Sequence, residues 1–176
     1  MNGTQLVLRP ATADDERLLA GLLAGLSPAS AFHRFMAGLG TPKPALVRGL
    51  LRADERRGAW LAIEHGPDGS ERAVGHACWS VDDAGVADLG VVVADDAQGR
   101  GVGRALFEAS AATAAGAGAV GVHLDVHPDN RRVARILRDR LGSRALGWQD
   151  GLLTLDGPLL DAVRAVPGNR RLLAAA

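Results

Sequence analysis

The sequence contains no tyrosine and a single cysteine, Cys78, and only 3% of its 176 residues are aromatic. One cysteine excludes an internal disulfide framework and any zinc site built from several thiolates. The 20 basic and 20 acidic side chains cancel, which argues against a nucleic-acid binder, since such proteins carry a basic surplus. No uncharged apolar run reaches about 18 residues and no signal-peptide pattern is present, so we expect a soluble, cytoplasmic protein that does not act at a membrane.

Apolar residues are plentiful, at 47% of the chain, which excludes a disordered polypeptide. At roughly 100–200 residues per domain the length predicts one domain. A domain of this size buries about 70% of its unfolded surface and needs no disulfide or metal for stability. We expect this domain over residues 1–160, and a tail over residues 161–176 that is partly helical or frayed.

The hydrophobic pattern alternates between strand and helix periods, which predicts an α/β protein. A continuous apolar run in residues 86–93 indicates a strand that is buried on both faces. Strands are predicted at residues 5–9, 59–64, 73–81, 86–93, 120–126, 145–149 and 152–156. Helices are predicted after Thr12, after Ser27, and over residues 45–52, 104–115, 131–141 and 159–166.

The most informative segment is residues 91–106, VVVADDAQGRGVGRAL, where a buried strand enters a loop with three alternate glycines. Glycine lets a backbone approach a ligand closely. The helix that follows offers unpaired N–H groups and the positive end of its dipole, and Arg100 and Arg104 add formal charge. The segment predicts an anion site, most often one for phosphate. The alternative is a glycine-rich turn that only packs the strand against the helix.

Two common phosphate motifs do not fit this loop. The dinucleotide fingerprint G-x-G-x-x-G would need its third glycine at Arg104 or Leu106, and the mononucleotide loop would need a G-K-[ST] sequence. The spacing that fits is Q-x-x-G-x-G, at Gln98, Gly101 and Gly103. With it, the stretch V-x-x-x-x-Q-G-R-G-V-G-x-x-L resembles the acyl-CoA signature of the GCN5-related N-acetyltransferase (GNAT) superfamily.

The resemblance extends over about residues 6–155, because the order of the predicted strands and helices is the order found in that superfamily. Residues 127–142 resemble its next motif, in which Asn130 caps a helix, although Ser143 stands where the family carries Phe. The resemblance implies the α/β (α+β) GNAT fold, a mixed and mostly antiparallel sheet of about seven strands with about four helices. In that fold strands 86–93 and 120–126 splay apart at the CoA site.

The resemblance also implies acetyl-CoA as the cosubstrate. In the family the loop amides hold the CoA pyrophosphate, and the preceding strand pairs with the pantetheine arm. Arg131 or Arg132 are further candidates for contacting the phosphates. Carried over by motif position, the cofactor-binding residues are Val91, Val93, Gln98, Gly99, Arg100, Gly101, Val102, Gly103, Arg104 and Asn130.

Acetyl transfer to an amine needs a base for the amine and a donor for the developing oxyanion. The resemblance implies the backbone N–H of Val92 or Val93 as the donor. Asp88 interrupts an apolar strand and precedes Val93 by five residues, the spacing of a Glu in the branch that resembles protein-lysine acetyltransferases. We expect Asp88 to deprotonate the amine, directly or through water. The alternative is an ordinary strand-end carboxylate that faces solvent.

The missing tyrosine matters here, because the family often uses a Tyr on the helix after Asn130 to protonate the leaving thiolate. The matching position in this chain is Leu137 or Arg138. Either the CoA thiolate leaves without an acid, or another group serves. Cys78 is one candidate, although a lone strand cysteine is more often a small core residue.

The segment at residues 26–36, LSPASAFHRFM, resembles the acceptor entry of bacterial protein-lysine acetyltransferases. The substrate-pocket candidates are Phe32, His33, Phe35 and His76. Core packing is the alternative for the two phenylalanines, and a satisfied core position is the alternative for His76.

A further set, His123, Asp125 and His127, alternates along one strand and so shares a face. A metal site is one interpretation of this set, but we expect strand-end groups beside the CoA wedge and no metal.

The sequence therefore predicts an enzyme that moves the acetyl group of acetyl-CoA to a primary amine by direct attack in a ternary complex. A protein lysine and a small-molecule amine are both candidate acceptors. We expect no nucleic-acid partner, and either a monomer or a homodimer. The alternative is a catalytically inactive, acyl-CoA-binding regulatory module.

Overall fold

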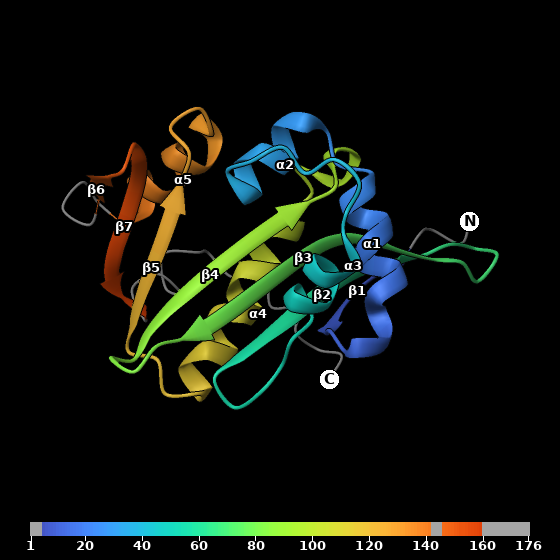
Figure 1. Cartoon of the computed structure of the whole chain (residues 1–176), viewed down its shortest axis with the longest axis horizontal. Coiled ribbons are helices and arrows are strands. Elements are labelled where there is room, and N and C mark those ends of the chain that lie inside the picture. Colours follow the sequence, from blue (N-terminus) through green and yellow to red (C-terminus); the bar gives the residue numbers. More distant parts are fainter. Residues whose placement is uncertain (1–4, 142–145, 160–176) are drawn as a thin grey trace.

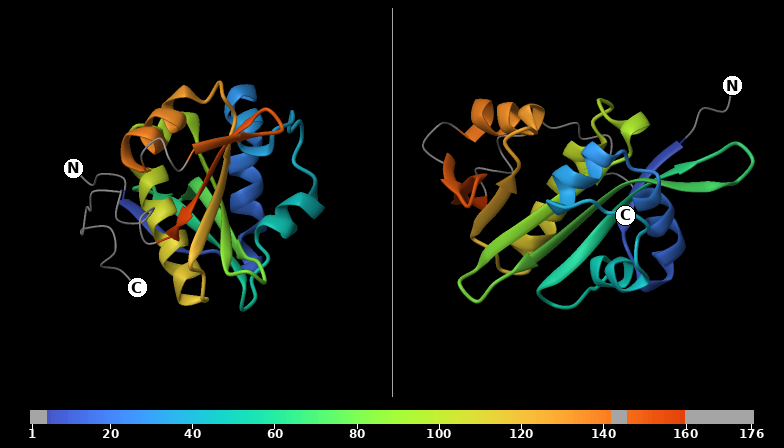
Figure 2. Two further views of the ribbon diagram at one scale, coloured as in Figure 1. Left: turned by 90° about the vertical axis from the view of Figure 1, so that its left-hand side faces the viewer. Right: turned by 45° about the horizontal axis from the view of Figure 1, so that its top comes forward.

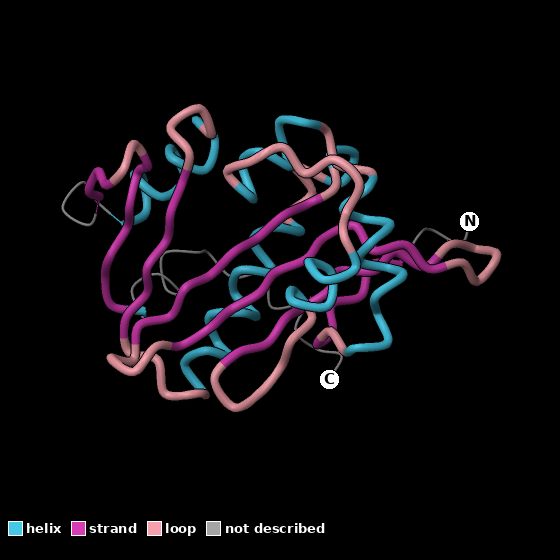
Figure 3. Tube along the Cα trace, viewed as in Figure 1, coloured by secondary structure: helices cyan, strands magenta, loops and turns pink. Residues whose placement is uncertain are grey.

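The computed structural model describes residues 5–141 and 146–159. They form one seven-stranded sheet with the order β1-β2-β3-β4-β5-β7-β6 (Figures 1 and 3). The strands are β1 (Gln5–Pro10), β2 (Arg57–His65), β3 (Glu71–Val81), β4 (Val86–Val93), β5 (Gly121–Val126), β6 (Leu146–Gln149) and β7 (Leu152–Pro158). The helices are α1 (Glu16–Ala24), α2 (Pro28–Phe35), α3 (Pro44–Leu50), α4 (Val102–Gly116) and α5 (Arg131–Leu141), with 3₁₀ turns η1 (Ala13–Asp15) and η2 (Asp95–Ala97).

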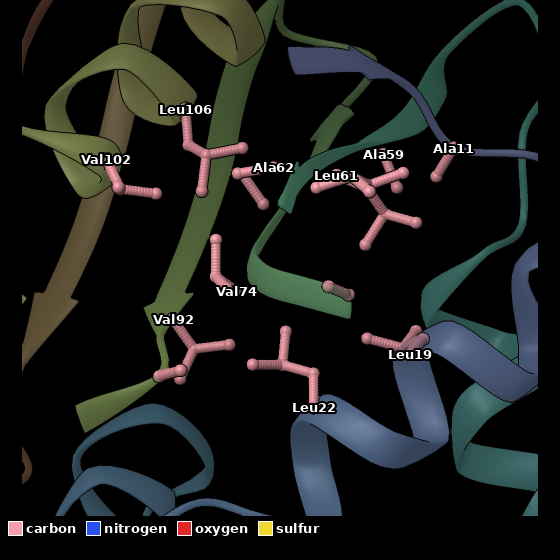
Figure 4. Packing of buried hydrophobic residues seen from close by; sticks show 14 of the residues in the cluster. Ala11, Leu19, Leu22, Ala59, Leu61, Ala62, Val74, Val92, Val102 and Leu106 are labelled. Atoms are coloured by element: carbon pink, nitrogen blue, oxygen red, sulfur yellow. The ribbon is translucent and has the colours of Figure 1, made fainter. Parts of the chain in front are cut away.

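The described helices cover both faces of the sheet (Figure 2). On one face α1 presents Leu19, Leu22 and Leu23 at helical spacing, and these side chains are almost completely buried against the central strands (Figure 4). On the other face the alanine-rich α4 packs closely against β2, β3 and β4 because its side chains are small. The core therefore lies in two layers, one on each side of the sheet.

The predicted mixed sheet of seven strands is confirmed, and the described residues include five α-helices where about four were expected. The hairpin strands β2 and β3 are longer than predicted. Helix α4 begins at Val102, two residues before its predicted start, so Gly103 lies in its first turn. The residues predicted as a tail, 161–176, lie outside the described part of the chain, as does Ser143.

The neighbouring strands β4 and β5 pair over only part of their length, and this pairing positions the site. They form the one parallel pair in the described sheet, over Val86–Asp88 and Gly121–His123. Beyond those residues β5 stays paired with β7, while β4 stays paired with β3. The edge of β4 that faces β5 therefore has no strand partner from Leu89 onward. The predicted splayed pair is confirmed, and we call the gap between the two strands the wedge (Figure 1).

Candidate active site

The wedge opens into a cavity of about 790 Å³. This volume lies within the range of about 300–1,000 Å³ that is usual for small-molecule sites. Its walls come from β3, β4 and β5, from the glycine loop before α4, from α2, from the start of α5 and from the end of α3. Segments that lie far apart in the sequence therefore meet around one space.

The glycine loop forms one end of this cavity. Gly99 and Gly101 have φ angles of 82° and 87°, in the left-handed region that glycine adopts without strain. Gly101 is also the N-cap of α4, so no cap side chain satisfies the first N–H groups of the helix. Gly103 packs on β4, where a Cβ would lie 3.3 Å from Cγ2 of Val93. These features fit a pyrophosphate held by backbone amides at a helix N-terminus.

Eight of the ten residues expected to bind the cosubstrate line the cavity, and two do not. The side chain of Arg100 turns away, because its Nη1 forms a 2.6 Å ion pair with Oε1 of Glu64 on β2. The side chain of Val102 is 1% exposed and packs in the core, so only its backbone faces the loop. The residues that line the cavity are Val91, Val93, Gln98, Gly99, Gly101, Gly103, Arg104 and Asn130.

Gln98 has a structural task besides lining the cavity. Its Nε2 donates to the backbone oxygen of Val93 and to Oγ of Ser30, each at 3.2 Å. Next to it, Asp95 accepts hydrogen bonds from the Ser27 N–H at 2.9 Å, the Ser27 hydroxyl at 2.7 Å and the Ser30 hydroxyl at 2.8 Å. Burial raises the pKa of Asp95, but these hydrogen bonds outweigh it and lower the pKa overall. The first turn of α2 is thereby fixed to the segment that follows β4.

Helix α2 reaches from β4 towards the end of β5. The Phe32 ring meets the His127 ring edge-on with centroids 4.9 Å apart, and the His33 ring stacks on the same His127 ring at 6.0 Å. His33 and Phe35, both expected in the substrate pocket, line the cavity. Phe32 does not line it and is 39% exposed.

His76, the fourth residue expected in the substrate pocket, does not line the cavity. It is completely buried in β3, and its Nε2 lies 3.2 Å from the backbone oxygen of Leu50 at the end of α3. Burial lowers the pKa of His76 to about 4, so the ring is neutral at physiological pH. This contact supports the end of α3, which itself lines the cavity.

Asp88 lies at the apex of the wedge. It is the last residue of β4 paired with β5, and it lines the cavity with an exposed side chain. Its carboxylate makes no hydrogen bond to any other described residue. Cross-strand pairing places it between Ser80 on β3 and His123 on β5. An unpaired carboxylate at this point has the access that a general base needs.

The sequence predicted His123 to be a strand-end group beside the CoA wedge, with a metal ligand as the alternative, and the structure gives it carboxylate partners. Its Nδ1 lies 2.6 Å from Oδ1 of Asp156 on β7, and its Nε2 lies 3.2 Å from Oδ1 of Asp125. The hydrogen bond with Asp156 raises the pKa of His123, with charge contributions from Asp125, Asp156 and Asp88. The alternation of His123 and Asp125 was visible in the sequence, but Asp156 was not, because it lies 33 residues away.

The pairing of β4 separates the two expected oxyanion donors. The Ala94 N–H donates to the Val74 oxygen on β3 at 2.9 Å. N–H groups alternate in direction along a strand, so the Val92 N–H also faces β3 and is unavailable. The N–H groups of Val91 and Val93 face the wedge. Of the two residues expected as the donor, Val93 alone has the required direction.

Cys78 lines the cavity from β3 with a half-buried side chain. Burial raises the pKa of its thiol, so the group stays protonated at neutral pH. Helix α5 carries Leu137 and Arg138, the positions that match the family's tyrosine, but their side chains lie outside the part that the structure describes.

Among the described residues, no group of three or more His, Cys, Asp or Glu side chains could hold a metal ion. No described helix combines the length and the apolarity needed to span a membrane.

Comparison with known proteins agrees with this geometry. The family model for the acetyltransferase (GNAT) family matches residues 30–142, which is more than half of the chain. The chain therefore belongs to the acetyltransferase (GNAT) family. A search of curated protein sequences found no match.

Solved structures share the fold. The GNAT domain of S. lividans PAT is 24% identical, with a TM-score of 0.71 over 86% of this chain and 89% of that one. A GCN5-related N-acetyltransferase from Kribbella flavida is 23% identical, with a TM-score of 0.65 over 87% and 97% of the two chains. A mutant of a cAMP-binding acyltransferase from Mycobacterium smegmatis is 25% identical, with a TM-score of 0.54 over 92% of this chain. This chain spans only 51% of that last protein.

Proposed function

We propose that the protein transfers the acetyl group of acetyl-CoA to a primary amine by direct attack in a ternary complex. Membership of the GNAT family supports acyl-CoA-dependent N-acyltransfer in general. The observation that carries the specific proposal is the wedge, because one cavity holds a phosphate-binding loop, the free N–H of Val93 and the unpaired carboxylate of Asp88. A protein lysine and a small-molecule amine both satisfy this chemistry.

Each group in the wedge has one task in this proposal. Acetyl-CoA supplies an activated acyl group as a thioester. The glycine loop and the first N–H groups of α4 bind its pyrophosphate, and the edge of β4 aligns the pantetheine arm. Asp88 takes the proton from the amine that attacks the acyl carbon, and the Val93 N–H donates to the negative charge that develops on the carbonyl oxygen. Departure of the thiolate needs no tyrosine, since a CoA thiol is acidic enough to leave unassisted near neutral pH.

The test measures turnover of acetyl-CoA with a panel of amines, and the release of the CoA thiol is the signal that is recorded. We expect amine-dependent thiol release and intersecting initial-rate patterns, which indicate a ternary complex. Asp88→Asn should lower kcat by about a hundredfold or more. The matched control is Asp83→Asn, since Asp83 is fully exposed on the turn between β3 and β4.

Two outcomes would contradict this proposal. An unchanged kcat and pH profile in Asp88→Asn would remove Asp88 as the base. Binding of acetyl-CoA by calorimetry without turnover of any amine would instead favour a regulatory module that binds acyl-CoA.

A further inference from the structure

The charge of the cavity differs from the charge of the whole chain. The chain has 20 basic and 20 acidic side chains. Among the charged side chains that line the cavity, arginines outnumber carboxylates. The arginines are Arg34, Arg52, Arg57, Arg104 and Arg132, and the carboxylates are Asp88 and Asp125. A cavity with this excess of positive charge favours anionic ligands.

The five arginines divide between the two ends of the cavity. Arg104 lies in the first turn of α4, and Nη2 of Arg132 comes within 3.8 Å of the position that a Cβ would take at Gly99. These two serve the phosphate loop. The other three come from α2, from the segment after α3 and from the start of β2, on the opposite side of β4. Phosphates bound at the loop do not account for them.

Arg34 is the best placed of those three residues. Its guanidinium lies directly over Gly90 of β4, in space that any Cβ at that position would occupy. Nη2 donates to Sγ of Cys78 at 3.0 Å, and the group lies 5.3 Å from the centroid of the Phe35 ring. Gly90 is two residues from Asp88 on the same face of the strand, which corresponds to roughly 7 Å along β4. Arg34 therefore faces the side of the wedge from which an amine must approach Asp88.

The hydrogen bonding of Arg34 is incomplete. A guanidinium has five N–H donors, and its acceptor among the described residues is the Cys78 thiol, which accepts weakly. Nε is buried and has no acceptor in that part of the chain. Arg34 also forms no ion pair with any carboxylate of the described ranges, whereas Arg57 is paired with Asp54 at 2.8 Å. Because a buried N–H without an acceptor is costly, the partly buried guanidinium of Arg34 is suited to bind an anionic partner.

We propose that Arg34 binds an anionic group of the acceptor, so that the preferred amine substrate carries a carboxylate a few bonds from its nitrogen. The inference rests on the proposed function and adds the substrate class to it. Arg52 lines the same part of the cavity and adds positive charge there, whereas the charge of Arg57 is paired with Asp54. The planar fork of Arg34 matches a carboxylate in two parallel hydrogen bonds. The carboxylate belongs either to a free amino acid or to an acidic residue beside a lysine in a peptide.

The experiment compares amines that differ in the carboxylate alone. One arm uses ω-amino acids from glycine to aminohexanoate against alkylamines of the same chain length. The other arm uses lysine peptides flanked by Glu against the same peptides flanked by Gln. Each is measured as kcat/KM in the wild type, in Arg34→Gln, in Arg34→Lys, and in the control Arg17→Gln, whose site is exposed on α1 outside the cavity.

We expect the wild type to favour the carboxylate-bearing member of a pair by about tenfold or more. Arg34→Gln should bring that ratio close to one, Arg34→Lys should keep part of the preference, and Arg17→Gln should keep all of it. Whichever arm shows the preference identifies the source of the carboxylate. Equal rates within the pairs of both arms, or a preference that Arg34→Gln retains, would overturn the proposal.

A binding measurement separates this inference from the proposed function. If no amine is acetylated, the proposed function fails, and aminohexanoate is then titrated into the acetyl-CoA-bound protein by calorimetry. Binding that is lost in Arg34→Gln would still support the anion subsite. Absence of binding in the wild type would overturn it as well. Thermal unfolding of each variant shows whether its fold is intact.

Discussion

The two ends of the cavity are formed by different kinds of chemical group. The phosphate end consists mainly of backbone groups, with two glycines at positive φ and the open N-terminus of α4, to which Arg104 and Arg132 add charge. The acceptor end consists of side chains from α2, α3, β2, β3 and β4, which meet only after the chain has folded. The backbone groups of the phosphate end are continuous in sequence, within residues 98–104, while the acceptor end draws on segments from residue 30 to residue 88.

This difference affects how each end responds to substitution and to pH. Backbone amides have no ionisable state and arginine stays protonated, so the phosphate end depends mainly on the conformation of the loop. The acceptor end carries charged or ionisable side chains, namely His33, Arg34, Cys78 and Asp88, and it rests on the buried His76. We therefore expect backbone strain to damage the first end selectively and changes of pH or charge to damage the second.

The largest effect that tests this comparison is expected at Gly101, which has a φ of 87°. Gly101→Val places a β-branched residue in the left-handed region, which costs about 1–3 kcal/mol in strain. The substitution should weaken CoA binding by roughly a hundredfold, measured by calorimetry, because the loop must abandon this conformation. The control is Gly116→Ala at the other end of α4, where a Cβ meets open space. Unchanged CoA affinity in Gly101→Val would show that the loop does not bind the phosphates.

The next effect concerns His76 and pH. Its pKa is lowered to about 4 in the folded protein, from an ordinary value of 6.5. Between these values the unfolded chain binds a proton that the folded protein does not, so stability falls as the pH falls. Between pH 7 and pH 5 this group alone should reduce the free energy of unfolding by about 2 kcal/mol.

The matched variant is His76→Gln, which keeps a donor for the Leu50 oxygen but does not titrate. Urea unfolding at the two pH values should show a smaller loss of stability in this variant. If the variant lost as much stability as the wild type between pH 7 and pH 5, the loss could not be assigned to His76. The measurement also separates the two ends, since CoA affinity of the folded protein should change little over the same range.

A smaller effect is expected where the two ends are joined, at Asp95. Asp95→Asn removes the negative charge that accepts three hydrogen bonds from Ser27 and Ser30. Hydrogen bonds to charged groups contribute about 1.5–3 kcal/mol when buried and less at an exposed site. We expect KM for the amine to rise about fivefold, with CoA affinity unchanged. Asp96→Asn is the control, because Asp96 pairs with Arg72 and does not contact α2. Equal effects of the two variants would exclude this coupling.

The smallest effect is expected at the apex of the wedge. Asp156→Asn removes the carboxylate whose hydrogen bond is the main cause of the raised pKa of His123. The pKa of His123, measured by NMR titration of the ring protons, should fall towards its ordinary value of 6.5. A pKa that stays raised would assign the effect to Asp125 and Asp88 instead. Turnover should change less than in Asp88→Asn, because Asp156 does not line the main cavity.

Much of the fold and of the phosphate end could be predicted from the sequence. The glycine spacing after an apolar strand marked the loop, and element order predicted the seven-stranded sheet. The prediction missed the true start of α4 at Val102, since helix propensity alone does not place a boundary that Gly101 determines. It also assigned Arg100 to the phosphates, because nothing local reveals the partner Glu64, 36 positions earlier in the chain.

The acceptor end could be predicted only in part. The segment with Phe32, His33 and Phe35 was recognised, but Arg34 between them was not. Its importance arises because α2 crosses β4 at Gly90, and the sequence carries no signal for that crossing. Likewise, the sequence of β4 could not decide whether the N–H of Val92 or that of Val93 is the oxyanion donor. The direction of each N–H depends on how β4 pairs with β3.

Consecutive residues are enough to specify the strands and helices, the phosphate loop and the lack of a tyrosine acid, because periodicity, glycine spacing and composition are local properties. Three further features follow from packing alone: where β4 and β5 part, which N–H groups face the wedge, and which arginine lies over Gly90. Each of them depends on contacts between residues far apart in the chain. A site made of backbone groups is formed by one segment, whereas a site made of side chains is formed where many segments pack together.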